Sequence, residues 1–139
     1  MALNPKTAAA RRNAALDTVF DTLNSGNLRV ADSTQPTDAD TALGAQVDLA
    51  DCAFGATAFG AASAGSKAAN AITQDSSINA SGTASWATLQ ATGIAFSGSN
   101  ARVMDMSVGT SGANLNFNSV AFSSGAACQI TSLTCTQAA

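Results

Sequence analysis

The sequence predicts a mainly β protein, an antiparallel β-sandwich or jelly-roll-like barrel with one N-terminal α-helix. After residue 26, apolar residues recur in short alternating runs, which is the period of half-buried strands. Gly, Ser and Asn, which are typical turn residues, separate these runs. We expect about seven to nine short strands, a number that suits a sandwich or barrel. The sequence shows no repeat of fixed period, so we expect neither a solenoid nor a propeller.

The helix is expected within residues 1–26. Asn4 is a favourable N-cap and Pro5 suits the first helical position. Larger apolar residues follow at helical spacing only in the second half, at Leu16, Val19, Phe20 and Leu23. The run Asn24-Ser25-Gly26 predicts the end of the helix. The chain therefore divides into an N-terminal helix, 1–26, and a β-sandwich domain, 27–139, which together form a single domain.

The alternation of larger side chains with polar or small ones is clearest over 43–49, 103–108 and 129–136. We expect strands at 28–30, 43–49, 67–73, 82–89, 103–108, 115–117, 120–122 and 129–136. Residues 32–41 contain Pro36 and three Asp, and they predict a loop. The stretch 52–60 contains Gly55 and Gly60 and is expected to be irregular.

The composition argues against an enzyme. The chain has no His, no Tyr and no Glu, so the side chain that most often moves protons near neutral pH is missing. Charged residues make up 11% of the chain, against roughly 25% in ordinary soluble domains. So few charges suggest that much of the surface faces protein. We therefore expect no catalytic residue, no cofactor and no metal site.

Charge and hydropathy also limit the partners. The net charge is −3, and the basic residues form no stripe beyond the N-terminal trio Lys6, Arg11 and Arg12, so we expect no nucleic acid partner. The chain shows no apolar segment typical of a secretion signal or a membrane span, and we expect a soluble product with no membrane partner.

The three cysteines are an odd number, which argues against a complete disulfide framework. Cys128 and Cys135 are seven residues apart, and an unbroken strand would separate them by about 23 Å. Cys52 could pair with either of them. In a reducing cytosol we expect buried free thiols rather than a bridge.

Four features resemble functional sites but have simpler interpretations. Asp38 and Asp40, with Asp32 nearby, could offer oxygen ligands to a cation, but the twelve-residue loop of a calcium site is missing, so we expect a solvated turn. Asp105 lacks an identifiable acid or base partner and is expected to face outward from its strand. Residues 109–112 lack the Lys of a phosphate-binding loop and predict a hairpin turn. Lys67 follows Ser63 and Ser66 and could form a Ser–Lys catalytic pair, but we expect it to begin a strand or to lie at an interface.

We assign structural roles to two groups of residues. The candidate core anchors are Leu16, Phe20, Trp86, Phe117 and Ile130. For Trp86, the alternative is an interface hot spot. The candidate interface residues are Lys6, Arg11 and Arg12, on the Ala-rich first half of the helix. We expect the second half of the helix to dock on its own domain, leaving the first half free to meet an acidic neighbouring surface.

Several segments resemble small proteins encoded among the structural genes of tailed bacteriophages and prophages. The longest is the run Arg102-Val103-Met104-Asp105-Met106-Ser107-Val108-Gly109-Thr110-Ser111-Gly112-Ala113-Asn114-Leu115-Asn116-Phe117-Asn118. Shorter ones lie at 12–17, 28–30, 35–43 and 82–86. The likeness covers most of the chain through structural motifs of low complexity. The chain departs from the family after Trp86, and we expect a Ser- and Gly-rich excursion over 94–100.

The resemblance implies a non-enzymatic virion structural protein, best described as a capsid decoration or cement protein that stabilises the head. Its partners would be the major capsid protein or other virion subunits, and it would form a homo-oligomer, with a trimer favoured. It would be made in the bacterial host cytoplasm and reside in the virion. Short strands with edges to pair would suit such assembly.

Two alternatives remain open. One is a tail, connector or fibre component of the virion. The other is a glycan- or host-binding module, since jelly-roll folds often bind glycans. Glycan sites favour exposed aromatic side chains, whereas this chain has one Trp and no Tyr.

Overall fold

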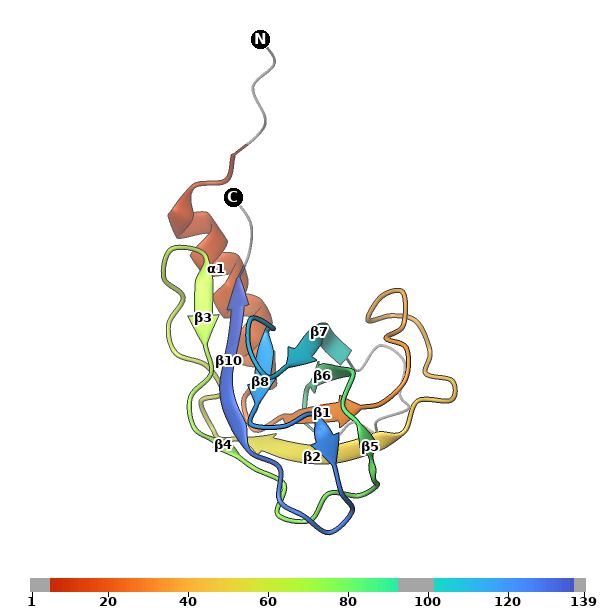
Figure 1. Ribbon diagram of the computed structural model, residues 1–139. Helices are drawn as coiled ribbons and strands as arrows, with labels where there is room; N and C mark the ends of the chain where they lie inside the picture. The colour runs from red at the N-terminus through yellow and green to blue at the C-terminus, as the bar shows by residue number, and fades with distance from the viewer. Residues whose placement is uncertain (1–5, 93–101, 137–139) are drawn as a thin grey trace.

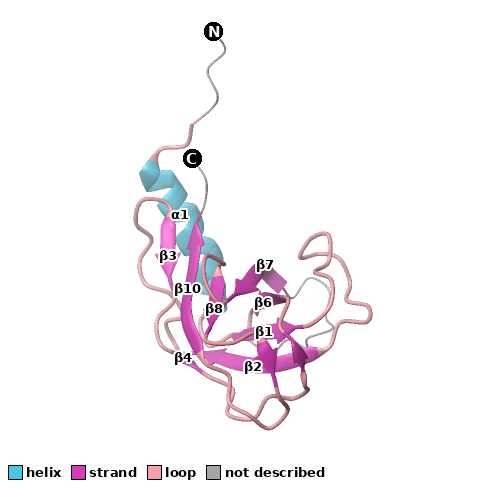
Figure 2. Ribbon diagram, viewed as in Figure 1, coloured by secondary structure: helices cyan, strands magenta, loops and turns pink. Residues whose placement is uncertain are grey.

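The computed structural model describes residues 6–92 and 102–136 (Figure 1). It confirms the predicted fold class: the chain is mainly β, with one N-terminal helix beside a curled sheet that forms a half-barrel (Figure 2).

The helix α1 spans Ala9–Phe20 and continues into a 3₁₀ turn at Asp21–Leu23. The strands are β1 (Asn27–Ala31), β2 (Asp48–Phe54), β3 (Ser66–Ala68), β4 (Ile72–Thr73), β5 (Gly82–Thr83), β6 (Trp86–Gln90), β7 (Arg102–Gly109), β8 (Leu115–Phe117), β9 (Ala121–Phe122) and β10 (Ile130–Thr136). In these described ranges no helix is long and apolar enough to cross a membrane.

Eight strands form the main sheet in the order β3-β10-β8-β7-β6-β1-β2-β4, and β5 pairs with β9 in a small second sheet. Neighbours in the main sheet are antiparallel except for β7 and β8, which are parallel. β3 and β4 lie at opposite edges of the sheet, yet only residues 69–71 separate them in the chain. Because three residues span only about 10 Å, the sheet must curl until its two edges approach each other.

The two edges of the main sheet offer little backbone for pairing with another chain. Bridges from Ser63 to Ser66 and from Phe59 to Ala69 cover β3, and β4 is only two residues long. Short and covered edges prevent uncontrolled sheet extension. The expectation that free strand edges would drive assembly is therefore not supported by this fold.

The main core lies on the concave face of the sheet. The registers of β1, β2 and β6 place Leu28 opposite both Cys52 and Leu89, and these three side chains are fully buried. Helix α1 adds Leu16 and Phe20, and the Phe20 ring packs edge-on against Phe59 at 4.7 Å between ring centres. The apolar stripe of the helix and the alternation of the strands therefore meet in one cluster.

The opposite face of the central strands is polar but also covered. Trp86 is 1% exposed, but it lies outside the main apolar cluster. Its indole Nε1 donates to the carbonyl oxygen of Asp32 at 3.0 Å, and the Arg102 guanidinium lies 5.8 Å from the ring centre. All five residues of β6 are buried, and the loop that follows β1 contacts Trp86 and Arg102 on this second face.

The helix differs from its prediction at both ends. Residues 6–8 are not helical and α1 begins at Ala9, while Asn4 and Pro5 lie outside the described residues. At the other end Ser25 adopts the left-handed conformation, with φ of 58°. Gly26 is required because of lack of space and not because of its backbone conformation: a Cβ there would lie 2.3 Å from the carbonyl oxygen of Gln90.

The strand predictions need five corrections. Residues 43–47 form a loop, and β2 begins at Asp48 and continues through Phe54, inside the stretch expected to be irregular. The expected strand 67–73 is split into β3 and β4, and the expected strand 82–89 into β5 and β6. Residues 109–112 are not a hairpin turn, because the strands they connect are parallel. The expected excursion at 94–100 lies outside the described residues, although β6 and β7 on either side of it pair antiparallel.

Candidate functional site

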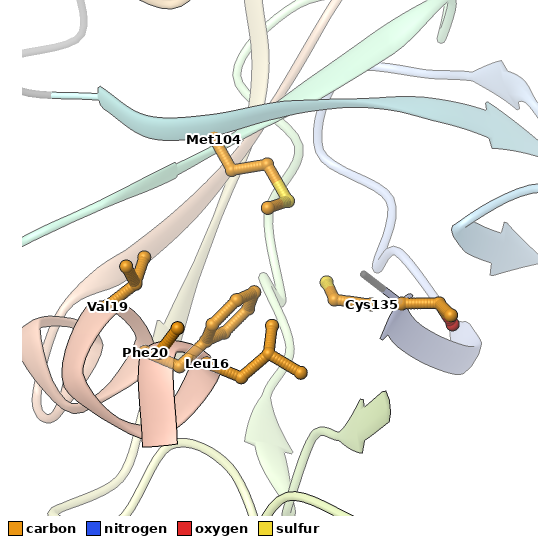
Figure 3. Close-up of a pocket in the computed structure, with 7 residues that line it drawn as sticks. Leu16, Val19, Phe20, Met104 and Cys135 are labelled. Atoms are coloured by element: carbon orange, nitrogen blue, oxygen red, sulfur yellow. The ribbon is translucent and has the colours of Figure 1, made fainter. Parts of the chain in front are cut away.

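An apolar groove of about 310 Å³ lies between α1, β7 and the end of β10. Figure 3 shows Leu16, Val19 and Phe20 on the helix, with Met104 of β7 and Cys135 of β10 across the opening. Ala15 and Thr136 complete the lining. Val19 is 43% exposed, unlike the other members of the predicted helical stripe, because it lies beside the core and not over it.

The wall that α1 contributes is fixed by polar contacts on another side of the helix. The Nζ of Lys67 in β3 lies 2.7 Å from Oδ1 of Asp17, which also accepts the Ala62 N–H at 3.1 Å. The amide N–H of Gly65 donates to Oδ1 of Asn13 at 2.9 Å. These contacts secure α1 to β3 and to the loop before it, and they hold the helical wall of the groove in position.

Lys67 therefore has a structural role that its sequence context did not reveal. Its side chain is 2% exposed, and Asp17 provides its close carboxylate partner. The hydrogen bond from Lys67 lowers the pKa of Asp17, and the Ala62 N–H adds to the effect. Lys67 is the middle residue of the short strand β3, which begins one position before the start that the sequence suggested, and its charge is paired within the chain.

The candidate interface residues Lys6 and Arg11 are exposed at and before the start of α1. Arg12 is half-buried, and its guanidinium donates to the carbonyl oxygen of Thr7. Two cations of the predicted trio are thus available to a partner, whereas the third folds back on its own backbone.

Arg102 holds a loop and is not a surface charge. Its guanidinium donates to the carbonyl oxygens of Ala39 at 3.1 Å, Asp38 at 3.0 Å and Thr41 at 2.5 Å. The Asp38 carboxylate accepts the Asp40 N–H and the Thr41 hydroxyl, which closes the turn. This acidic segment is therefore organised by hydrogen bonds within the chain.

The expectation that Asp105 faces outward is wrong. Its side chain is 3% exposed, and its Oδ1 lies 3.4 Å from Nε of Arg102. Burial raises the pKa of Asp105, although Thr88 and Arg102 act in the opposite direction. Asp105 faces inward because the second face of β7 is covered where Arg102 binds the loop.

A further charged cluster of three residues lies on the same side of the sheet as Arg102 and Asp105. Arg29 lies 2.6 Å from Asp48 and 3.1 Å from Asp51. Desolvation raises the pKa of Asp48, and the hydrogen bond from Arg29 opposes this change. Arg29, Lys67 and Arg102 thus each bind a carboxylate within the chain. In the parts of the chain that the structure describes, no three His, Cys, Asp or Glu side chains are grouped to hold a metal ion.

The candidate core anchors occupy different environments. Leu16, Phe20 and Phe117 belong to the main cluster and Trp86 to the second face, while Ile130 is only partly buried at the edge of the cluster. The three cysteines are buried and unbridged, and Cys52 approaches Cys128 with 3.3 Å between their sulfur atoms. Sequence reasoning left open which cysteine Cys52 meets, because 76 residues separate the pair.

The chain was compared with protein-family models, curated proteins and solved structures, and none of the three comparisons finds a match.

Proposed function

We propose that this protein is a non-enzymatic structural protein of a bacteriophage virion, a decoration or cement protein that stabilises the capsid. The observation that carries the proposal is the apolar groove along α1, where Val19 is 43% exposed, together with the exposed cations Lys6 and Arg11 at the start of the same helix. Its sequence resemblance to small virion proteins of tailed phages supports the assignment.

The occupant of the groove is an apolar segment of the major capsid protein, flanked by acidic residues. The groove has room for only a few side chains, so each contact is modest and the acidic flank adds charge complementarity to Lys6 and Arg11. A homo-oligomer, with a trimer favoured, would present several grooves at once, and multivalent binding would then raise the affinity greatly. A protein that binds the assembled shell in preference to its free subunits stabilises that shell by mass action.

The arrangement of charged and aromatic side chains supports a structural role over a glycan-binding one. Arg29, Lys67 and Arg102 are engaged in internal ion pairs. Among the described residues, Trp86 and every Phe are buried, so no aromatic ring is presented for stacking on a sugar. Phe96 lies outside the described residues. The virion role is therefore favoured over a glycan-binding module.

The first test is the location and copy number of the protein in purified particles made by the genome that encodes it. Quantitative mass spectrometry and electron cryo-microscopy should find hundreds of copies spread over the head. A few copies at the tail or at one vertex would instead assign it to the tail, connector or fibre. Absence from the particle would refute the virion role altogether.

The second test addresses the groove with a matched pair of valines. Val19 lies in the groove and Val47 lies in the loop before β2, and their exposed fractions are 43% and 42%. We expect Val19→Gln to weaken binding to capsids that lack the protein at least tenfold, while Val47→Gln binds as the unmodified chain does. Equal binding of both variants would exclude the groove as the capsid contact.

A further inference from the structure

Cys52 and Cys128 form a close pair that none of the roles above uses. Cys52 lies in β2 and Cys128 in the segment that precedes β10, and their sulfur atoms are 3.3 Å apart. Both residues are buried, at 0% and 3% exposure. A disulfide bond is about 2.05 Å long, so the two sulfurs need to approach by only about 1.2 Å to form one.

Asp75 ties the backbones around both cysteines to one point. Its carbonyl oxygen accepts the N–H of Cys128 at 3.0 Å. Its carboxylate accepts the N–H of Asp51, the residue before Cys52, at 3.1 Å. Because the same residue holds both segments, the two thiols are positioned by the fold and not by chance contact of flexible side chains.

The two thiols differ in ionisation. The hydrogen bond from Cys52 lowers the pKa of Cys128 to about 7, against the effect of desolvation. The same contact, together with burial, raises the pKa of Cys52. Since the thiolate is the nucleophile in exchange with disulfides, these directions and the position of Cys128 beside a surface pocket make Cys128 the attacking member of the pair.

Cys128 also has a route to small reagents. It is one of the residues that line a surface pocket of about 190 Å³, together with Ile78, Asn118, Phe122 and Gln129. Cys52 is not among the residues that line this pocket. A small molecule that enters the pocket therefore meets Cys128 first.

We propose that Cys52 and Cys128 are a redox-active dithiol that closes to an intramolecular disulfide when a low-molecular-weight disulfide enters this pocket. The Cys128 thiolate attacks one sulfur of the reagent, forming a mixed disulfide and releasing the first reagent thiolate. Cys52 then loses its proton and attacks Sγ of Cys128, which forms the internal bond and releases the second thiolate. Two protein thiols are oxidised by two electrons, and the reagent disulfide is reduced to two thiols that take up the two protons.

The bond would join distant parts of the sheet. β2 and β10 are each next to an edge strand, at opposite ends of the strand order, and the curl of the sheet brings those ends together. A disulfide between Cys52 and Cys128 would therefore close the half-barrel covalently. Cross-links across long loops stabilise most strongly, and we expect the melting temperature to rise by about 10 °C.

The experiment treats the reduced, full-length protein with bis(2-hydroxyethyl) disulfide, a reagent small enough for the pocket that Cys128 lines, under native conditions and follows the free thiols after denaturation. We expect the thiol count to fall from three to one, with a loss of two hydrogens in the intact mass and a Cys52–Cys128 cross-link in peptide maps. The rate should increase as pH is raised, because the Cys128 thiolate is the attacking species. A native protein that keeps all its thiols, while the denatured chain reacts, would overturn the proposal.

Alanine variants separate the roles of the cysteines. Cys135 is the matched control, since it is also buried but lies in the groove beside α1, and burial raises its pKa to about 11. We expect Cys135→Ala to form the disulfide as the unmodified chain does. Cys52→Ala should accumulate one reagent adduct on Cys128, more slowly at neutral pH because this variant lacks the contact that lowers the pKa of Cys128. Cys128→Ala should form neither an adduct nor a bridge. A bridge to Cys135, or an adduct on Cys52 in the Cys128→Ala variant, would refute the assigned order.

Discussion

The ammonium group of Lys67 lies 2.7 Å from the Asp17 carboxylate, and this pair connects the N-terminal helix to strand β3. The Lys67 side chain is only 2% exposed, whereas that of Asp17 is 43% exposed. An ammonium group that is buried this deeply needs its partner, since an unpaired buried charge is strongly destabilising. The contact therefore sets both the position of α1 and the shape of the groove that the helix borders.

The first prediction concerns Asp17→Asn. The folded state lowers the pKa of Asp17 below its ordinary value near 3.8. Its contribution to stability is therefore present above that value and is lost as pH falls through the lower folded pKa. We expect the melting temperature of Asp17→Asn to be lower than that of the unmodified protein at neutral pH, and we expect this difference to disappear as the solution is acidified. Thermal melts across pH provide the measurement.

Asp21→Asn is the matched control for this prediction. Asp21 lies 3.9 Å from the same Lys67 nitrogen and is 69% exposed, so its interaction is weak. We expect its melting curve to follow that of the unmodified protein. If both variants lose the same stability, the effect belongs to the general charge of the helix end and not to the 2.7 Å contact.

The second prediction concerns Asp105→Asn, which should show the opposite dependence on pH. Burial raises the folded pKa of Asp105 above its ordinary value near 3.8, so the folded state penalises the charged form at neutral pH. The unmodified protein regains this free energy as pH falls through the raised folded pKa. We therefore expect any advantage of Asp105→Asn to be largest near neutral pH and to shrink on acidification.

The same melts at several pH values test this second prediction. Arg102 keeps its three carbonyl partners in the Asp105→Asn variant, which limits the loss from breaking the ion pair. If acidification raises the melting temperature of the variant relative to that of the unmodified protein, the direction assigned to the pKa shift of Asp105 is wrong.

The third prediction concerns Trp86. We expect Trp86→Ala to destabilise the fold by about 3–5 kcal/mol, the range for emptying a large buried aromatic site. Trp86→Phe should lose less, because it fills most of the space and gives up chiefly the hydrogen bond to Asp32. Denaturant unfolding gives these values, and the single Trp reports its own environment by fluorescence. A solvated indole spectrum, with a mutant as stable as the unmodified chain, would place Trp86 at an interface.

The spacing of large apolar residues in the sequence predicted the elements in which these residues recur at a helical or an alternating period. Leu16, Phe20 and Leu23 are buried at their helical spacing, and the alternation over 103–108 and 129–136 corresponds to β7 and β10. The same rule failed at 43–47, where alternating Leu and Val side chains belong to a loop and Val47 is 42% exposed. Alternating side chains indicate which face of a strand would be buried, but they do not show that a neighbouring strand is present to pair with it.

The contacts that shape the candidate sites left no local signal in the sequence. Lys67 meets Asp17 across 50 residues, and Cys52 meets Cys128 across 76. Arg102 binds backbone carbonyl oxygens, which any residue supplies, so its partners could not be identified from side-chain types. The curl of the sheet brings these groups together. That curl depends on the strand order, which composition and spacing do not reveal.

The last prediction concerns the start of the helix and its charges. Deleting residues 1–12 removes Lys6, Arg11 and the first turn of α1, but it keeps Leu16 and Phe20 in the core and Asp17 on Lys67. We therefore expect the truncated protein to remain folded. It should bind capsids lacking this protein more weakly than the full chain does, and the difference should be larger at low salt than at high salt, because salt screens exposed charges within about 10 Å at 0.1 M and 3 Å at 1 M.

The double variant Lys6→Gln with Arg11→Gln separates charge from helix length, since it keeps the whole segment and removes only the two exposed cations. We expect it to reproduce the salt-sensitive part of the loss, and to bind at high salt as the unmodified chain does. Binding of the truncated chain that equals full length at both salt concentrations would mean that the segment is only an element of the fold. A loss that is independent of salt in both variants would show that these cations do not meet an acidic surface.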